Sequence, residues 1–96
     1  MFRSEKLRRA VASLPCQHCG RDGHTQAAHR NESKGMGLKT SDALLAALCV
    51  NCHRELDQGK YMSKAERRDM WNRACILTYQ ALVESGVLVV KERANG

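Results

Sequence analysis

The stretches Cys16-Gln-His-Cys19 and Cys49-Val-Asn-Cys52 decide the fold of this chain, as two C-x-x-C pairs separated by 29 residues. Each pair can present two thiolates from one tight turn, and four thiolates together make the closed tetrahedral site typical of structural zinc. Gly20, directly after the first pair, supplies the permissive backbone that such a turn needs. The spacing therefore predicts one structural Zn²⁺ bound by these four cysteines.

The size and composition of the chain explain why a metal anchor is expected. Ninety-six residues predict a single domain, and a core with one Trp, two Tyr and one Phe is small for independent stability. No apolar run approaches the roughly 20 residues of a membrane span, and the first fifteen residues lack the apolar stretch of a secretory signal. We therefore expect a soluble, cytoplasmic protein whose cysteines stay reduced.

Two cysteine features need separate interpretation. Cys49-Val-Asn-Cys52-His53 also has the C-x-x-C-H pattern of covalent haem attachment. That alternative normally requires export and would leave the first C-x-x-C pair unexplained. Cys75 lies within a helical pattern, so we interpret it as an apolar packing residue.

Local patterns predict the elements around the cysteines. Residues 4–13 are predicted as a short basic helix, residues 24–29 as a strand and residues 50–58 as a short helix. Residues 44–48 fit either a strand or a helical turn, because periodicity does not separate the two. Residues 30–41 contain two glycines without periodicity and are predicted as a loop.

The C-terminal third is dominated by one predicted helix over residues 64–85. Ser63-Lys-Ala-Glu66 is a capping box that opens it, and Gly86 can close it. Residues 87–90 are predicted as a terminal strand. The apolar positions of the helix are predicted to line one face: Met70, Ala74, Leu77, Ala81 and Leu82, with Trp71 and Tyr79 beside them.

Charge is concentrated in the first part of the chain. The net charge is +6, of which residues 1–39 contribute +5, from eight basic and three acidic residues. Residues 40–96 contribute +1, from eight basic and seven acidic residues. A basic half on a small domain favours a polyanionic partner, most simply nucleic acid, and the alternative is a solubilising surface.

Three further residues form a pattern with the cysteines. His29 ends the predicted strand, His53 follows the last cysteine, and Asp57 lies four residues later on the same helical face. A histidine and a carboxylate with this spacing can hold one divalent metal ion. Glu55 points elsewhere and is expected to face solvent, and His18 and His24 are expected at the surface.

The run Leu48-Cys49-Val-Asn-Cys52-His53 leading into a helix, with a histidine-bearing strand between the two cysteine pairs, resembles the HNH endonucleases and their ββα-metal fold. The longer pattern Ala28-His29-Arg30, Lys34-Gly-Met-Gly-Leu-Lys39-Thr-Ser-Asp42 and Cys52-His53-Arg-Glu-Leu-Asp57 is similar to small phage and prophage HNH-type nucleases, including recombination-enhancing ones. The resemblance covers about residues 14–60.

The resemblance implies a role for each matching residue. His29 takes the place of the general base that activates water, and imidazole exchanges protons near neutral pH. His53 takes the place of a ligand of the catalytic metal, and Asp57 fits a second ligand. That ion is Mg²⁺, or Mn²⁺ or another softer divalent ion favoured by imidazole. Many members carry a metal-binding Asp where this chain has Ala28.

The residue that orients the base has no match at the usual offset. Asp42 is the nearest candidate in position and Asn31 the nearest in type. The alternative for Asp42 is a cap on the turn that follows it.

These observations predict an α+β fold with a small zinc-stabilised, treble-clef-like core, a ββα-metal unit and flanking helices. One HNH-like zinc domain over residues 1–96 is divided into a basic helix (1–13), the metal core (14–60), a long helix (63–85) and a tail (86–96). The expected function is a metal-dependent DNA endonuclease that hydrolyses phosphodiester bonds, phage or prophage encoded, with recombination proteins as possible partners. The expected phosphate contacts are Arg3, Arg8, Arg9, Arg30, Lys34 and Lys39.

Two rival functions belong to different classes. The first is a non-enzymatic zinc module that binds DNA or a protein and carries a decayed catalytic site, which Ala28 favours. The second is a zinc-stabilised interaction protein whose long helix dimerises.

Overall fold

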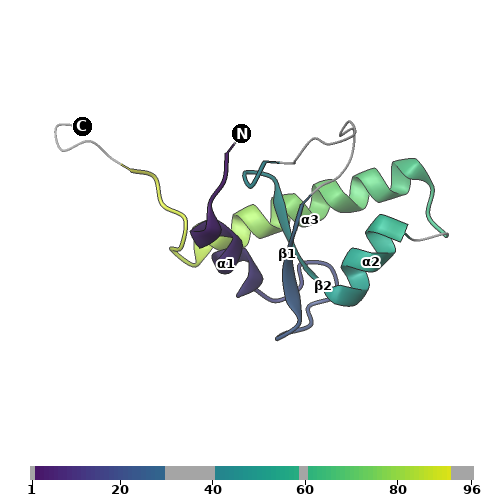
Figure 1. Cartoon of the computed structure of the whole chain (residues 1–96), viewed down its shortest axis with the longest axis horizontal. Helices are drawn as coiled ribbons and strands as arrows, with labels where there is room; N and C mark the ends of the chain where they lie inside the picture. Colours follow the sequence, from purple (N-terminus) through teal and green to yellow (C-terminus); the bar gives the residue numbers. More distant parts are fainter. Residues whose placement is uncertain (1, 30–40, 59–60, 92–96) are drawn as a thin grey trace.

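The described part of the chain comprises residues 2–29, 41–58 and 61–91 of a computed structural model. It contains three helices and one two-stranded antiparallel sheet (Figure 1). The order is α1 (Glu5–Ala12), β1 (Thr25–His29), β2 (Leu45–Cys49), α2 (Val50–Gln58) and α3 (Lys64–Glu84). This small α+β architecture confirms the α+β class that the sequence predicts. None of the helices described is long and apolar enough to cross a membrane.

The sheet is a hairpin in which Thr25 pairs with Cys49 and His29 pairs with Leu45. The ambiguous apolar segment before the second cysteine pair is therefore a strand. All five residues of β2 are buried. A continuous apolar run is what a strand covered on both faces requires.

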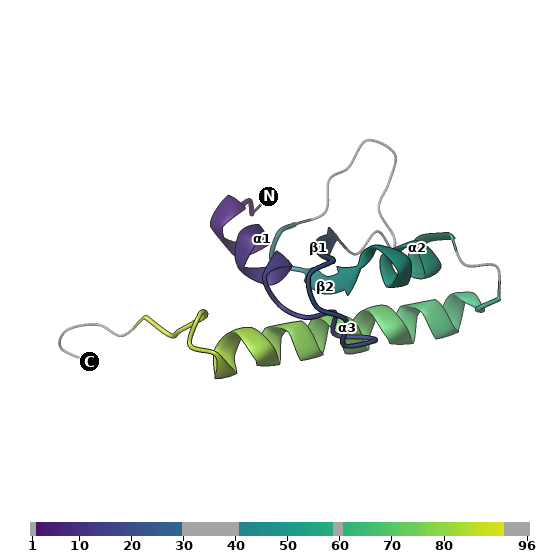
Figure 2. The same cartoon turned by 90° about the horizontal axis from the view of Figure 1, so that it is seen from below.

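Successive side chains of β2 point into two separate hydrophobic clusters. Ala46 and Leu48 pack in one cluster with Leu56 of α2 and Trp71 of α3. Leu45 and Ala47 face the other cluster, which is shared by α1 and the C-terminal half of α3. Figure 2 shows α3 running lengthwise along one side of the molecule, with α1 beside its C-terminal half and α2 beside its N-terminal half. The hairpin is thus enclosed by all three helices.

The predicted N-terminal helix is confirmed as α1, and a local signal explains where it begins. Ser4 is the N-cap, and its hydroxyl accepts a hydrogen bond from the backbone N–H of Leu7 at 3.1 Å. Arg9 donates to Glu5 one turn earlier at 2.6 Å on the exposed side. Val11 is buried against the sheet, so this short helix is held mainly by its apolar face.

Helix α3 has the predicted capping box, with Ser63 and Glu66 exchanging hydrogen bonds of 2.9 and 3.1 Å. Gly86 closes it with a φ of +79°. The buried face differs from the prediction. Its buried members are Trp71, Ala74, Thr78 and Leu82, whereas Met70, Leu77 and Ala81 are half-buried and Tyr79 is exposed.

The burial of Thr78 accounts for the difference between the predicted and the observed buried face of α3. Its Oγ1 accepts a hydrogen bond from the backbone N–H of Ala47 at 2.9 Å and donates to the carbonyl of Ala74 at 2.7 Å. Because both bonds satisfy the hydroxyl, Thr78 can be buried between α3 and β2. A pattern of apolar residues alone does not reveal this position.

The predicted terminal strand over residues 87–90 is wrong. The backbone N–H groups of Val87 and Leu88 both donate to the carbonyl of Leu82, at 3.1 and 3.0 Å. These bonds hold the segment at the end of α3, and it projects away from the sheet (Figure 1). Leu88 packs on the α1 side of the core, while Val90 is 88 % exposed. The valines favour a strand, but no described strand lies beside this segment to pair with it.

Candidate functional site

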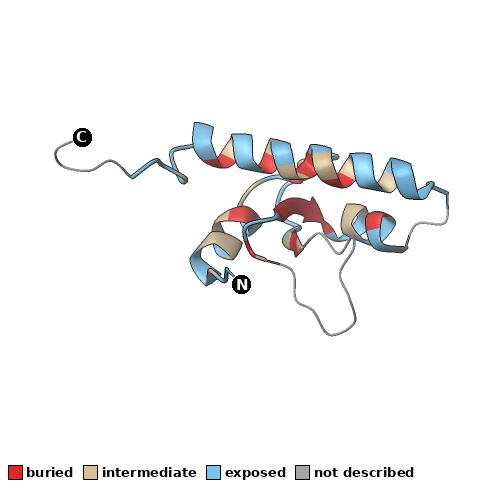
Figure 3. Cartoon of the chain, turned by 90° about the horizontal axis from the view of Figure 1, so that it is seen from above, coloured by how far each residue is buried: buried red, intermediate tan, exposed pale blue. Residues whose placement is uncertain are grey.

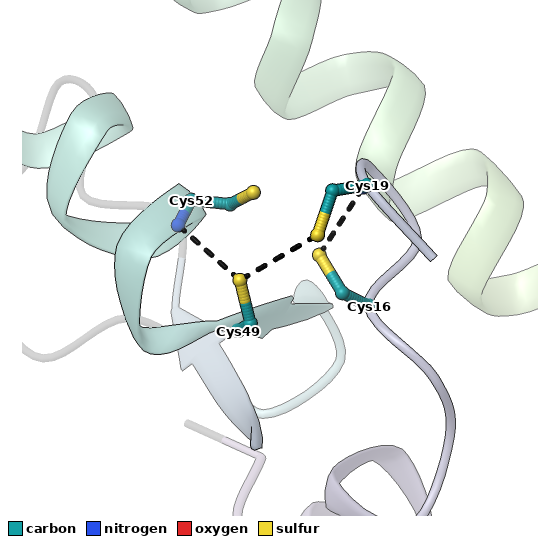
Figure 4. Close-up of side chains that lie close together, drawn as sticks. All are labelled: Cys16, Cys19, Cys49 and Cys52. Atoms are coloured by element: carbon teal, nitrogen blue, oxygen red, sulfur yellow. Dashed lines mark hydrogen bonds between the residues drawn. The ribbon is translucent and has the colours of Figure 1, made fainter. Parts of the chain in front are cut away.

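The four cysteines of the two C-x-x-C pairs converge at one end of the hairpin (Figure 4). Cys16 and Cys19 lie in the turn after α1, Cys49 ends β2, and Cys52 lies in the first turn of α2. The first pair is placed beside the sheet because the N–H of Gln17 donates to the carbonyl of Ala47 at 2.8 Å. All four Sγ atoms lie within 4.8 Å of one another.

The spacing of the sulfur atoms fits a zinc ion. The Sγ atoms of Cys19 and Cys49 are 3.7 Å apart, and tetrahedral Zn–S bonds of 2.3 Å imply about 3.8 Å between sulfurs. Backbone N–H groups also point at sulfur: that of Cys19 lies 3.4 Å from Cys16 Sγ, and that of Cys52 lies 3.5 Å from Cys49 Sγ. The cluster is therefore compatible with the structural zinc predicted from the sequence.

Within the cluster, the pKa values of two thiols, Cys16 and Cys52, are shifted in opposite directions. Burial on its own raises the pKa of the Cys16 thiol, but backbone N–H groups, first that of Cys19, outweigh it and lower the pKa to about 6. Burial, followed by the neighbouring thiols, raises the pKa of Cys52 far above its usual range. Four adjacent thiolates repel one another, and a divalent cation compensates for that repulsion.

A second polar cluster surrounds Asp42, which is fully buried. Its carboxylate accepts hydrogen bonds from His29 Nε2 at 2.6 Å and from the backbone N–H of Ser4 at 2.7 Å. Arg3 Nη1 donates to it at 3.2 Å, and Arg8 Nη1 makes a further ion pair. These hydrogen bonds, first that from His29, hold the pKa of Asp42 well below its usual range. Asp42 is therefore an ionised carboxylate that binds four donors among the described residues, and none of them belongs to the turn that follows it.

A third polar cluster lies at the start of α2. His53 Nε2 is 3.2 Å from Asp57 Oδ2, one helical turn away. Its Nδ1 is 2.9 Å from Gln26 Oε1 on β1. The imidazole also packs against the Trp71 ring in a T-shaped arrangement, with ring centroids 6.1 Å apart. The structure thus brings together His53 and Asp57, as the sequence predicted.

The clusters around Asp42 and His53 lie on different faces of the hairpin. Side chains alternate along β1, so Ala27 packs with α1 residues while Ala28 packs with Leu56 of α2. His29 shares the face of Ala27, and Gln26 shares that of Ala28. No hydrogen bond between described residues joins the two clusters.

Ala28 is only 1 % exposed, and it packs against Leu48, Leu56 and Trp71. The position at which many HNH nucleases carry a metal-binding aspartate is therefore part of the apolar core in this chain. A carboxylate at this position would be buried among apolar side chains.

The six residues expected to bind nucleic acid have different surroundings. Arg3 and Arg8 are part-exposed and bind Asp42, whereas Arg9 is well exposed and pairs only with Glu5 among the described residues. Four predicted residues lie outside the described part of the chain: Arg30, Asn31, Lys34 and Lys39. His18, His24 and Glu55 are exposed as predicted, and Cys75 is half-buried.

Sequence reasoning missed the bonds to Asp42 from the N-terminal segment and the role of Gln26. The bonds to Asp42 join residues that are 34 to 39 positions apart in the sequence, so no local signal predicts them. Gln26 could have been found from strand alternation, because it shares the face of Ala28.

Comparisons of the chain with protein-family models, curated proteins and solved structures find no match. Function must therefore be inferred from the residues and their geometry.

Proposed function

We propose that this chain is a metal-dependent DNA endonuclease of the HNH type, in which a treble-clef-like zinc core supports a ββα-metal unit made of β1, β2 and α2. The contact between His29 and the buried Asp42 is the observation that carries the proposal. The two are 13 positions apart in the sequence, and a histidine bonded to a buried carboxylate is a common arrangement for a general base.

The hydrogen bond to Asp42 selects the tautomer of the neutral His29 ring. An ionised carboxylate only accepts hydrogen bonds, so Nε2 must carry the proton and donate. Nδ1 then keeps its lone pair and can accept a proton from water. The side chain of His29 is 28 % exposed, so water and a phosphate group can reach it. His29 is accordingly assigned as the base and Asp42 as its positioning residue.

His53 and Asp57 are the residues that would hold the catalytic ion. Two adjacent ligands of an octahedral ion at 2.1 Å lie about 3.0 Å apart, and the observed separation of 3.2 Å fits this spacing. Gln26 fixes the other side of the imidazole. When bound, a divalent ion supplies Lewis-acid stabilisation of the scissile phosphate. Ala28 adds no ligand, so most of the coordination shell is left to water and phosphate oxygens.

The arginines of α1 and of the segment before it support a nucleic-acid substrate. Arg3 and Arg8 each use one guanidinium nitrogen on Asp42, which leaves other donors on part-exposed side chains close to His29. Arg9 adds an exposed positive charge on the same helix. These groups would bind phosphate next to the base.

Plasmid cleavage by the zinc-loaded protein tests the proposal. Supercoiled DNA is incubated with Mg²⁺, Mn²⁺ or EDTA, using wild type, His29→Ala and His24→Ala. We expect nicking with a divalent ion, none with EDTA, and loss of activity in His29→Ala only, because His24 is an exposed residue outside the Asp42 cluster. Metal-independent cleavage, or equal rates for wild type and His29→Ala, would refute the assignment.

The non-enzymatic rival is favoured by one specific observation. Ala28 is buried, so the described residues offer only His53 and Asp57 to a catalytic ion. In that case the chain would bind DNA through α1 and the zinc core without cutting it. DNA binding by fluorescence anisotropy with no nicking in any divalent ion would establish this alternative.

A further inference from the structure

An apolar cavity of about 320 Å³ opens between α1 and α3, away from the cysteine cluster. Leu7 and Val11 of α1 form one wall, Ile76 and Tyr79 of α3 form the opposite wall, and Leu44 lies at the start of β2. Asp42 also borders the cavity, but its carboxylate oxygens are already engaged by His29 and two arginines. The cavity therefore offers almost no polar partner to a ligand.

Large apolar side chains continue from this cavity onto the outer side of α3. Ile76 is 65 % exposed, Tyr79 is 63 % exposed, and Val83 continues the same side of the helix at the i, i+3, i+7 spacing. Figure 3 shows that the side of α3 turned away from the hairpin is exposed along the helix. Leu44 is half-exposed near the cavity. Contiguous apolar surface of this kind marks an interaction site.

The charges beside this surface are self-complementary. Arg73 and Glu84 lie on one flank of the Ile76–Val83 row, on the side away from the cavity, and they have opposite signs. When two copies of a helix pack antiparallel about a two-fold axis, the same flank of each copy meets. Arg73 of one copy then faces Glu84 of the other, twice per dimer.

Two independent features place the two-fold axis within one residue of the same point of α3. The midpoint between Ile76 and Val83 falls between Tyr79 and Gln80. The midpoint between Arg73 and Glu84 falls between Thr78 and Tyr79. Apolar contact and charge pairing are therefore satisfied together by one arrangement, centred on Tyr79 beside the cavity.

We infer that the outer face of α3, with the adjoining cavity, is the interface of a homodimer in which two α3 helices pack antiparallel around Tyr79. A nucleic acid does not fit this face, because its row is uncharged and its flanking charges cancel. A second copy fits, because it brings an apolar row of the same length and the opposite charge at each end. This inference does not depend on nuclease activity, since the row belongs to neither the cysteine cluster nor the His53 cluster.

The test is the mass of the full zinc-loaded chain against concentration, by sedimentation equilibrium. We expect a dimer whose dissociation constant rises at least about 100-fold in Ile76→Asp, because the new charge is buried twice in each dimer. Tyr61→Asp is the matched control, because Tyr61 is a large side chain that is more exposed than Ile76 and lies outside this face. It should leave the dimer unchanged.

A charge swap tests the antiparallel geometry separately. Arg73→Glu should weaken the dimer by placing two like-charged pairs across the interface, and Arg73→Glu combined with Glu84→Arg should restore it. A wild-type chain that stays monomeric up to roughly millimolar concentration overturns the inference. A dimer unaffected by Ile76→Asp, or a charge swap that fails to restore dimerisation, also overturns it. Circular dichroism of each variant checks that the fold is retained.

Discussion

Ala28→Asp would suit the proposed metal site but would destabilise the fold. An aspartate at this position is a metal ligand in many HNH nucleases, yet here the side chain is 1 % exposed and packs with Leu48, Leu56 and Trp71. An uncompensated buried charge costs about 3–5 kcal/mol. Small domains have about 5–15 kcal/mol of stability in total. We therefore expect Ala28→Asp to lose a large part of its stability, or to fail to fold.

Gln26→Asp is the matched variant on the same face of β1. Residue 26 is exposed, and Gln26 Oε1 lies 2.9 Å from the His53 ring. A carboxylate here stays in water, so its cost is small, and by accepting the hydrogen bond from His53 Nδ1 it would make Nε2 a more basic metal ligand. We expect near wild-type stability and tighter binding of Mn²⁺.

Both variants are measured by thermal unfolding of the zinc-loaded protein and by calorimetric titration with Mn²⁺. A loss of 3–5 kcal/mol corresponds to a fall in Tm of at least roughly 12 °C for a domain of this size. If Ala28→Asp unfolds at the wild-type temperature and binds Mn²⁺ more tightly than Gln26→Asp, residue 28 reaches the metal, and the burial of its side chain among Leu48, Leu56 and Trp71 is refuted.

Three other predictions test separate parts of the account. Elemental analysis should give one zinc per chain. Cys49→Ser should abolish both zinc binding and cooperative unfolding, because the core is too small to fold without the metal. A wild-type protein that is folded but contains no zinc would contradict this prediction. Thr78→Val should lower the free energy of unfolding by about 1–3 kcal/mol, because it leaves the Ala47 N–H unpaired. Thr78→Ser keeps the hydroxyl and should lower it less, when both variants are measured by denaturant titration. Arg9→Ala should flatten the slope of log Kd for DNA against log salt by about one phosphate contact, and an unchanged slope would remove Arg9 from the DNA interface.

The parts of the fold that follow from local signals were predictable from the sequence. Paired C-x-x-C spacing located the cysteine cluster, and Ser63 with Glu66 fixed the start of α3. Each of these signals lies within a few residues of the feature it specifies. The helix that follows Cys49 was predicted within the same bounds for this reason.

The parts that depend on long-range contacts were not predictable. Thr78 is buried only because β2 presents the Ala47 N–H to it, 31 residues away. The bonds from Arg3 and Arg8 to Asp42 arise when α1 packs beside the start of β2. Position alone made Asp42 a candidate, and only the structure places its oxygen 2.6 Å from His29.

The central claim is that His29 is the catalytic base and that Asp42 orients it. Its most direct test is the single-turnover cleavage rate of Asp42→Asn with Mn²⁺, measured alongside DNA affinity by fluorescence anisotropy. A positioned general base contributes about 10²–10⁴-fold to a rate. The account predicts a rate loss within this range, with DNA affinity close to that of wild type. A variant that binds DNA and cleaves it at the wild-type rate would contradict the claim.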